Sequence, residues 1–133
     1  MRGQAAIEYF VIIGIVIVAI TIVAGLAWQQ NETSTRVQQA NIAANKIASA
    51  ANSLYAQGPG ARASITVVMP SGYSSSRSSV QDNVITLSVF TPDGYMDVIV
   101  LTKANISGSP PTSSGLKIIE LETIEGYVNI TGS

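Results

Sequence analysis

The apolar positions of this chain follow three patterns, and the first is a long, mostly apolar run over residues 5–28. Within it, residues 11–28 contain no ionisable group. At about 1.5 Å of rise per residue, a helix of about 20 residues spans the roughly 30 Å hydrocarbon core of a bilayer. A helix that is apolar on every side is buried in lipid or in a protein core. The run therefore predicts either a transmembrane helix or a helix that is buried in an apolar protein core.

Residues 29–56 continue the helix as an amphipathic segment. Their apolar residues recur three and four positions apart, which predicts a single apolar face. The residues of this face are Val37, Ala40, Ala44, Ile47, Ala51 and Leu54. One helix from Gln4 to Tyr55 would be about 78 Å long, and Gln57-Gly58-Pro59-Gly60 ends it. We expect the rest of the chain to pack on this face.

Residues 61–133, which we call the head, alternate between apolar and polar positions in short runs. These runs predict strands at 63–69, 83–90, 95–102, 117–123 and 127–131, with loops at 70–79 and 105–114. Thr91-Pro92-Asp93-Gly94 predicts one hairpin and Glu125-Gly126 a second. The fold class is therefore α+β: a long hydrophobic helix with a small antiparallel sheet packed on its C-terminal half. A core from fewer than about 80 residues is marginal, so the head needs the helix face.

Composition excludes several classes of function. The net charge is −1 and the seven basic residues are scattered, unlike a nucleic-acid-binding surface. With no Cys and no His, zinc, haem and thiol chemistry have no ligand or nucleophile. We predict no cofactor, no metal and no enzymatic activity. Carboxylates near turns (Asp82, Asp93, Asp97) are able to contact calcium but are interpreted as turn caps; Glu120, Glu122 and Glu125 are interpreted as solvated charges on an exposed face or edge.

A single carboxylate, Glu8, lies near the start of the apolar run. A carboxylate at the centre of a membrane helix costs about 2.5–3.5 kcal/mol on insertion scales, and such residues usually mark a function. Two simpler interpretations remain open. A secretory signal with a cleavage site near Gly25-Leu26-Ala27 conflicts with the length of the run. A plain signal anchor explains the length but not Glu8.

The stretch from Arg2 to Phe10, RGQAAIEYF, resembles the leader of archaeal type IV pilins with a class III signal. Gly3, Gln4 and Glu8 match that motif in order and spacing, while Ala6 and Ile12 stand where the family often has Ser and Leu. The resemblance implies that a prepilin peptidase cuts between Gly3 and Gln4 and removes residues 1–3. It also implies storage in the cell membrane and polymerisation of helix 4–57 into an extracellular adhesion filament. An assembly ATPase and a membrane platform protein are the other implied partners.

Two roles for Glu8 follow from the resemblance. Glu8 either pairs with the Gln4 amine of a neighbouring subunit or lies at headgroup level beside water and its own amine. Cyclisation of an N-terminal Gln would remove that amine charge. Two other functions stay open: a subunit of an archaellum, which is a rotating filament of similar build, and a membrane-tethered monomeric β-domain that binds a ligand.

Three sequons occur, at Asn31, Asn105 and Asn129. Such triplets are frequent by chance, but the region is rich in Ser and Thr, and the resemblance implies a glycosylated surface. We expect a glycan on at least one of the three.

Overall fold

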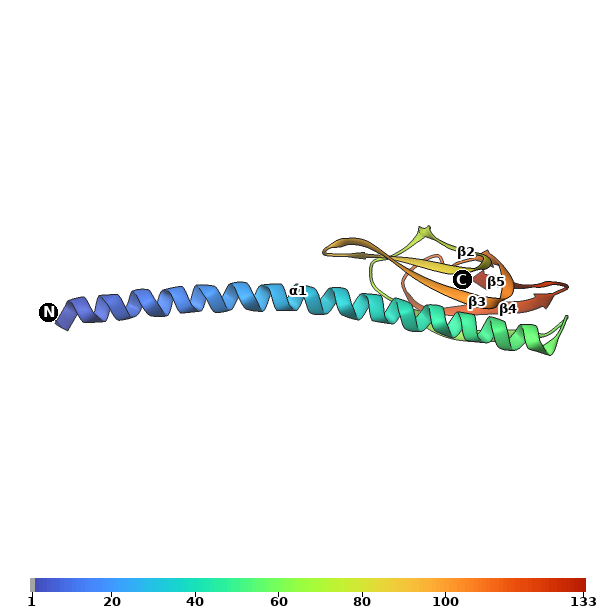
Figure 1. Ribbon diagram of the computed structural model, residues 1–133, viewed down its shortest axis with the longest axis horizontal. Helices are drawn as coiled ribbons and strands as arrows, with labels where there is room; N and C mark the ends of the chain where they lie inside the picture. The colour runs from blue at the N-terminus through green and yellow to red at the C-terminus, as the bar shows by residue number, and fades with distance from the viewer. Residues whose placement is uncertain (1) are drawn as a thin grey trace. The chain divides into compact units, whose positions relative to one another are not determined.

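The computed structural model describes residues 2–133, which form one helix followed by five strands (Figure 1). The chain divides between Glu32 and Thr33 into two compact units. The α+β class predicted from the sequence is confirmed. The elements are α1 (Arg2–Gln57), β1 (Arg62–Met69), β2 (Tyr73–Thr91), β3 (Gly94–Ser109), β4 (Gly115–Ile124) and β5 (Tyr127–Gly132).

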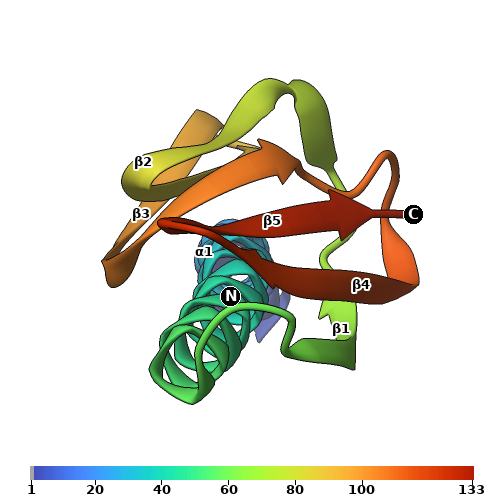
Figure 2. The same ribbon diagram turned by 90° about the vertical axis from the view of Figure 1, so that its right-hand side faces the viewer.

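The core of the second unit lies between the sheet and the part of α1 that begins at Thr33, and Figure 2 shows the strands curving over that part. The predicted apolar face is confirmed, because Ala40, Ala44, Ile47, Ala51 and Leu54 are at most 2% exposed. Ala43 and Ala48, which lie beside this face, are also buried. Because most of these residues are alanine, the sheet approaches the helix backbone closely.

The helix ends where its sequence predicts. The N–H of Gly58 donates to the carbonyl oxygen of Tyr55 at 3.2 Å. Gly58 and Gly60 have φ angles of 94° and 87°, a left-handed conformation that glycine adopts at little cost. The N–H of Gly60 and the carbonyl of Ala61 then bond to the backbone of Thr123, which starts the sheet beside the helix end.

The five strands form one sheet in the order β1-β4-β5-β3-β2. It is mostly antiparallel, as predicted, but β5 pairs with β3 in parallel. The reason is the path of the chain: β4 turns back through Glu125-Gly126 into β5, and β5 fills the place between β4 and β3. Gly108 of β3 lies opposite Ile130 of β5, and a Cβ there would overlap the Ile130 backbone.

The two predicted loops are shorter than the sequence suggests. The prediction of a loop over 70–79 is wrong from Tyr73 onward, because β2 begins there, and β3 continues through the predicted loop 105–114 as far as Ser109. The Ser-rich start of β2 folds back onto the end of the same strand, at the edge of the sheet, and acceptors there bond to N–H groups of that end. The N–H of Phe90 donates to the carbonyl of Gly72 at 2.7 Å, and the N–H of Ser88 donates to Ser78 Oγ at 3.0 Å.

Tyr73 secures the start of β2. Its phenol donates a hydrogen bond to the carbonyl of Pro111 at 2.9 Å. Burial raises the pKa of the Tyr73 phenol above its ordinary value, and a hydrogen bond with Ser78 acts in the opposite direction. This contact ties the β3–β4 connection to the edge of the sheet.

Polar side chains of α1 pair with backbone groups that the sheet leaves unpaired. Lys46 Nζ donates to the carbonyl of Thr66 on the edge strand β1 at 2.6 Å. The β2–β3 register shifts between Asp82 and Val84. Beside this shift, Asn52 Oδ1 accepts from the N–H groups of Lys103 and Ala104 at 2.9 and 3.2 Å. These bonds replace ladder bonds that the bulge has lost.

Replacing Asn52 with alanine is therefore expected to lower the free energy of unfolding of the head by about 1–3 kcal/mol, because two backbone donors lose their acceptor. Asn45→Ala is the matched control, since Asn45 Nδ2 donates to the backbone and side-chain oxygens of Asn41, one turn earlier in the same helix. A change within about 0.5 kcal/mol is expected for this surface substitution. Chemical unfolding of the full chain in detergent, followed by circular dichroism, measures both. Equal effects would show that Asn52 does not support the bulge.

Candidate functional site

The part of α1 before Thr33 has an apolar surface that nothing in the described chain covers. All side chains from Arg2 to Glu32 are exposed, including Phe10 at 74% and Trp28 at 79%. By length and composition the helix is able to cross a membrane: its most apolar window has a mean hydropathy of 3.0 and is 0% buried. An exposed apolar surface of this extent requires lipid or an apolar protein partner.

Small residues shape this surface. A Cβ added at Gly14 or Gly25 would meet nothing within 4 Å. Ala24 and Gly25 lie in a shallow depression whose lining includes Thr21 and Trp28. Thr21 Oγ1 donates to the carbonyl of Ile17 at 2.8 Å, so its hydroxyl is satisfied within the helix. Small residues and satisfied hydroxyls permit the close approach of a second helix.

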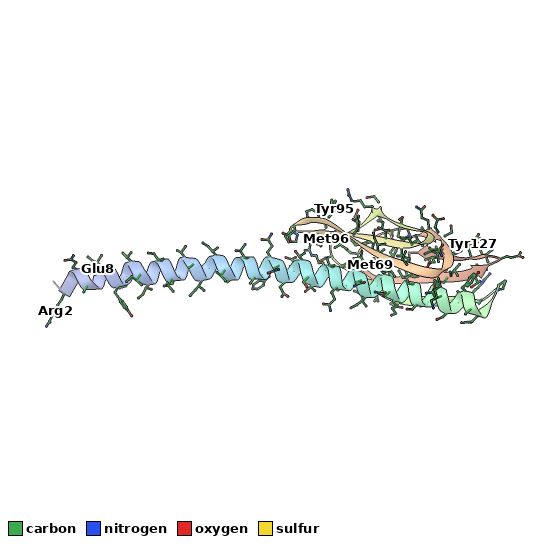
Figure 3. The ribbon with its side chains drawn as sticks, in the orientation of Figure 1. Arg2, Glu8, Met69, Tyr95, Met96 and Tyr127 are labelled. Carbon is green, nitrogen blue, oxygen red and sulfur yellow. The ribbon has the colours of Figure 1, made fainter. Side chains whose placement is uncertain are left out.

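The motif residues Gly3, Gln4 and Glu8 all lie in the first turns of α1 and are exposed. Gln4 and Glu8 are one turn apart, so they share a face of the helix, about 5–6 Å apart at Cβ. Figure 3 shows the Arg2 and Glu8 side chains projecting from this part of the helix. The peptide bond predicted for cleavage, between Gly3 and Gln4, lies inside the helix.

The three sequons lie in two places. Asn31 is exposed on α1, in the first unit. Asn105 and Asn129, far apart in sequence, lie on the adjacent strands β3 and β5, where Ser107 is the partner of Asn129. Both alternate with buried neighbours, so both are on the face of the sheet turned away from α1. Asn105 is exposed and Asn129 is half-buried, which makes Asn105 the more accessible acceptor.

Comparisons with models of protein families, with curated proteins and with solved structures find no match to this chain.

The carboxylates of the head occupy separate positions. Asp82 has a φ of 55° at the register shift, and Asp97 is opposite Ser88 in the ladder. Asp93 lies in the hairpin turn and accepts a bond from Thr33 Oγ1 at 3.3 Å. Within residues 2–133, no three His, Cys, Asp or Glu side chains are grouped so that they could hold a metal ion.

The outward face of the sheet carries a shallow hollow of about 400 Å³. Glu120 and Glu122 lie there on β4, which is an interior strand, whereas Glu125 is in the β4–β5 turn. Arg62 Nη2 lies 2.8 Å from Glu122 Oε1, with 76% and 40% of the side chains exposed. An ion pair this exposed contributes little to stability. The residues lining the hollow are Arg62, Ala63, Ser64, Glu120, Leu121, Glu122, Asn129 and Thr131.

The sequence predicted the turn between β2 and β3 but gave no functional role to the end of this hairpin, residues 90–96, which we call the hairpin tip. The Phe90 and Tyr95 rings pack edge to face there, 5.2 Å apart, and the Arg77 guanidinium lies 4.3 Å from the Tyr95 ring. Phe90, Tyr95 and Met96 are nevertheless 50%, 51% and 41% exposed. One local signal was available in the sequence. Phe90 and Tyr95 directly flank the Thr91–Gly94 turn, and they pair across the ladder, so both side chains lie on the same face of the sheet.

Proposed function

We propose that this chain is a structural subunit of an extracellular filament of the archaeal type IV pilus kind, made from a membrane-anchored precursor. The observation that supports this most is the uncovered apolar helix over residues 2–32, which begins with Gly3, Gln4 and Glu8 at prepilin spacing. An ordinary membrane anchor needs the apolar length but neither the carboxylate nor the small residues along the helix. A subunit that leaves the membrane to pack against its copies uses all three.

The proposed mechanism is assembly. The precursor waits with residues 5–28 in the membrane, and a prepilin peptidase removes residues 1–3. An assembly ATPase and a platform protein then drive extraction, and the helices bundle with no lipid between them. Burying one large apolar side chain contributes about 1.5–3 kcal/mol, and residues 5–28 hold thirteen Ile, Leu, Val and Phe residues. The filament should therefore resist dissociation strongly, while the heads form its outer surface and meet adhesion targets.

Glu8 is proposed to set the axial register between subunits. After cleavage, the new amine of Gln4 is the nearest cation to a carboxylate in an apolar core. A buried carboxylate is tolerated only when it is paired. A subunit that docks out of register would leave Glu8 unpaired, so pairing selects one position along the axis.

Substitution of Glu8 tests this role. Glu8→Ala and Glu8→Gln are expected to leave folding and membrane insertion intact but reduce the yield of sheared filaments at least about tenfold, the effect of losing about 1.4 kcal/mol. Glu8→Asp keeps the charge and is the matched control, with a smaller loss expected. Electron micrographs of sheared cells, with immunoblots of the membrane fraction, measure both quantities. Undiminished fibre yield from Glu8→Gln would remove the role assigned to the charge.

Native mass spectrometry with micrographs tests the function itself. A filament subunit begins at Gln4, or at its cyclised form, and is recovered in extracellular fibres; the same spectrum reports glycans at Asn31, Asn105 or Asn129. A chain that begins at Met1 and remains a monomer in the membrane fraction would instead be a tethered β-domain, and the proposal would be wrong.

A further inference from the structure

The hairpin tip exposes apolar side chains on both faces of the sheet: Phe90 and Tyr95, which pair across the ladder, on one face, and Met96, the partner of Val89, on the other. Phe90, Tyr95 and Met96 are each 41% exposed or more, although the core beside them is well buried. Figure 3 shows Tyr95 and Met96 at one end of the head and Tyr127 at the other. The Phe90 and Tyr95 rings pack edge to face and Arg77 lies over the Tyr95 ring. Contacts of this kind within the tip reduce the conformational freedom that is lost on binding a partner.

The tip is tied to the beginning of the second unit. Thr33 Oγ1 bonds to Asp93 at 3.3 Å, and Arg36 Nη1 donates to the carbonyl of Phe90 at 2.9 Å. Thr33 follows Trp28, the end of the apolar run, by five residues. Five residues span about 7.5 Å as helix and about 17 Å at full extension. This upper bound on the distance from Trp28 to Thr33 holds for every orientation of the two units.

We propose that, while the apolar run lies in the membrane, the hairpin tip docks into the headgroup layer next to Trp28. The polar layer on each side of the hydrocarbon core is about 5–8 Å thick, so the tip is within reach of it. Aromatic side chains favour this zone because one end of the ring is apolar and the other is polar. The inference rests on membrane anchoring of α1 and goes beyond the proposed filament: the head is oriented by a second membrane contact before assembly.

The charges around the tip suggest which lipids it needs. Arg36 bonds to Phe90 and Arg77 lies over Tyr95, while Asp93 is in the turn and Asp97 is two residues beyond Tyr95. These two positive and two negative charges balance, so docking should depend on apolar burial and not on anionic lipid. Assembly then has to lift the tip out of the headgroups as well as extract the helix. A second copy of the chain covering the tip is the competing occupant, and the experiment separates the two.

Because the chain has no cysteine, single labels can be placed at both ends of the head. A nitroxide on Met96→Cys reports the tip, and one on Tyr127→Cys is the matched control, since the two native side chains are 41% and 37% exposed. The full chain is reconstituted in phosphatidylcholine vesicles, and collision of each label with an aqueous nickel complex is measured. We expect collisions at position 96 to be several-fold rarer than at position 127. Equal collision rates would overturn the proposal.

Two further experiments show whether lipid or a second copy of the chain covers the hairpin tip. Changing Phe90 and Tyr95 to Ser in the Met96→Cys chain should return the label to water, with circular dichroism confirming that the sheet persists. Diluting the protein in lipid should leave the protection unchanged, as should adding phosphatidylglycerol. Protection that fades on dilution would assign the tip to a second copy, and protection that requires phosphatidylglycerol would assign it to headgroup charge; either overturns the proposal. Protection in a chain that forms no filaments would leave the docking standing while the proposed function fails.

Discussion

Replacing Gly108 with alanine is expected to destabilise the head by more than about 4 kcal/mol, a loss that single substitutions rarely cause. A Cβ at this position would overlap the backbone nitrogen, carbon and oxygen of Ile130. Gly108 also has a φ of 145°, where side chains are strained. Neither strand can move aside, because β3 is held by β2 and β5 by β4 on their other sides.

Gly94→Ala is the matched control for this substitution. Gly94 has a φ of 114°, but a Cβ there would meet nothing within 4 Å. Its replacement therefore measures backbone strain alone, at about 1–3 kcal/mol. Chemical unfolding of both variants in detergent, followed by the β-sheet signal in circular dichroism, gives the two losses. Similar losses would mean that the parallel β3–β5 contact is not tightly packed.

The helix, its buried face and both hairpins were predictable because their signals are local. The spacing of Ala40, Ala44, Ile47 and Ala51 is set by the helical period, and only one face of a helix can bury such a stripe. Pro92-Asp93-Gly94 specifies a turn by the backbone angles of its own residues. No neighbour distant in sequence is needed for either inference.

The parallel β3–β5 pair and the extent of β2 depend on contacts distant in sequence. The alternation of apolar and polar residues predicts which face of the sheet Ile130 is on, but it does not predict which strand pairs with β5. The Ser-rich start of β2 has the composition of a flexible loop. The bonds that the N–H groups of Ser88 and Phe90 donate to this stretch at the sheet edge are not visible in the sequence. The polar side chains of Lys46 and Asn52 likewise gain a role only once the strands lie against the helix.

The candidate functional residues also fall into a group with a local sequence signal and a group that depends on contacts distant in sequence. Gly3, Gln4 and Glu8 form a motif within one short stretch, so the sequence alone presents it. The hairpin tip depends on Asp93 and Phe90 reaching Thr33 and Arg36, which lie more than fifty residues earlier in the chain. Aromatic residues next to a turn are common, and the contacts of this turn with the start of the second unit become apparent only in the folded head.

Replacing Ile15 with lysine is expected to abolish filaments while leaving the precursor in the membrane. On insertion scales the lysine costs about 2.5–3.5 kcal/mol. Residues 5–28 keep twelve of their thirteen Ile, Leu, Val and Phe residues, which at about 0.3–0.6 kcal/mol each contribute roughly 4–7 kcal/mol toward insertion. Insertion therefore survives. In the proposed filament core the same charge has no partner, no lipid headgroup and no water, and an ion buried in protein costs several kcal/mol.

Gln38→Lys adds the same charge at an exposed position of α1 outside the apolar run, and we expect it to assemble normally. Sheared-fibre yield and the membrane-fraction immunoblot report assembly and insertion separately. Ile15 is 65% exposed in the single chain, so a loss of fibres cannot be attributed to an unfolded head. If Ile15→Lys gave fibres at the yield of Gln38→Lys, the apolar run would not lie in a dry helical core.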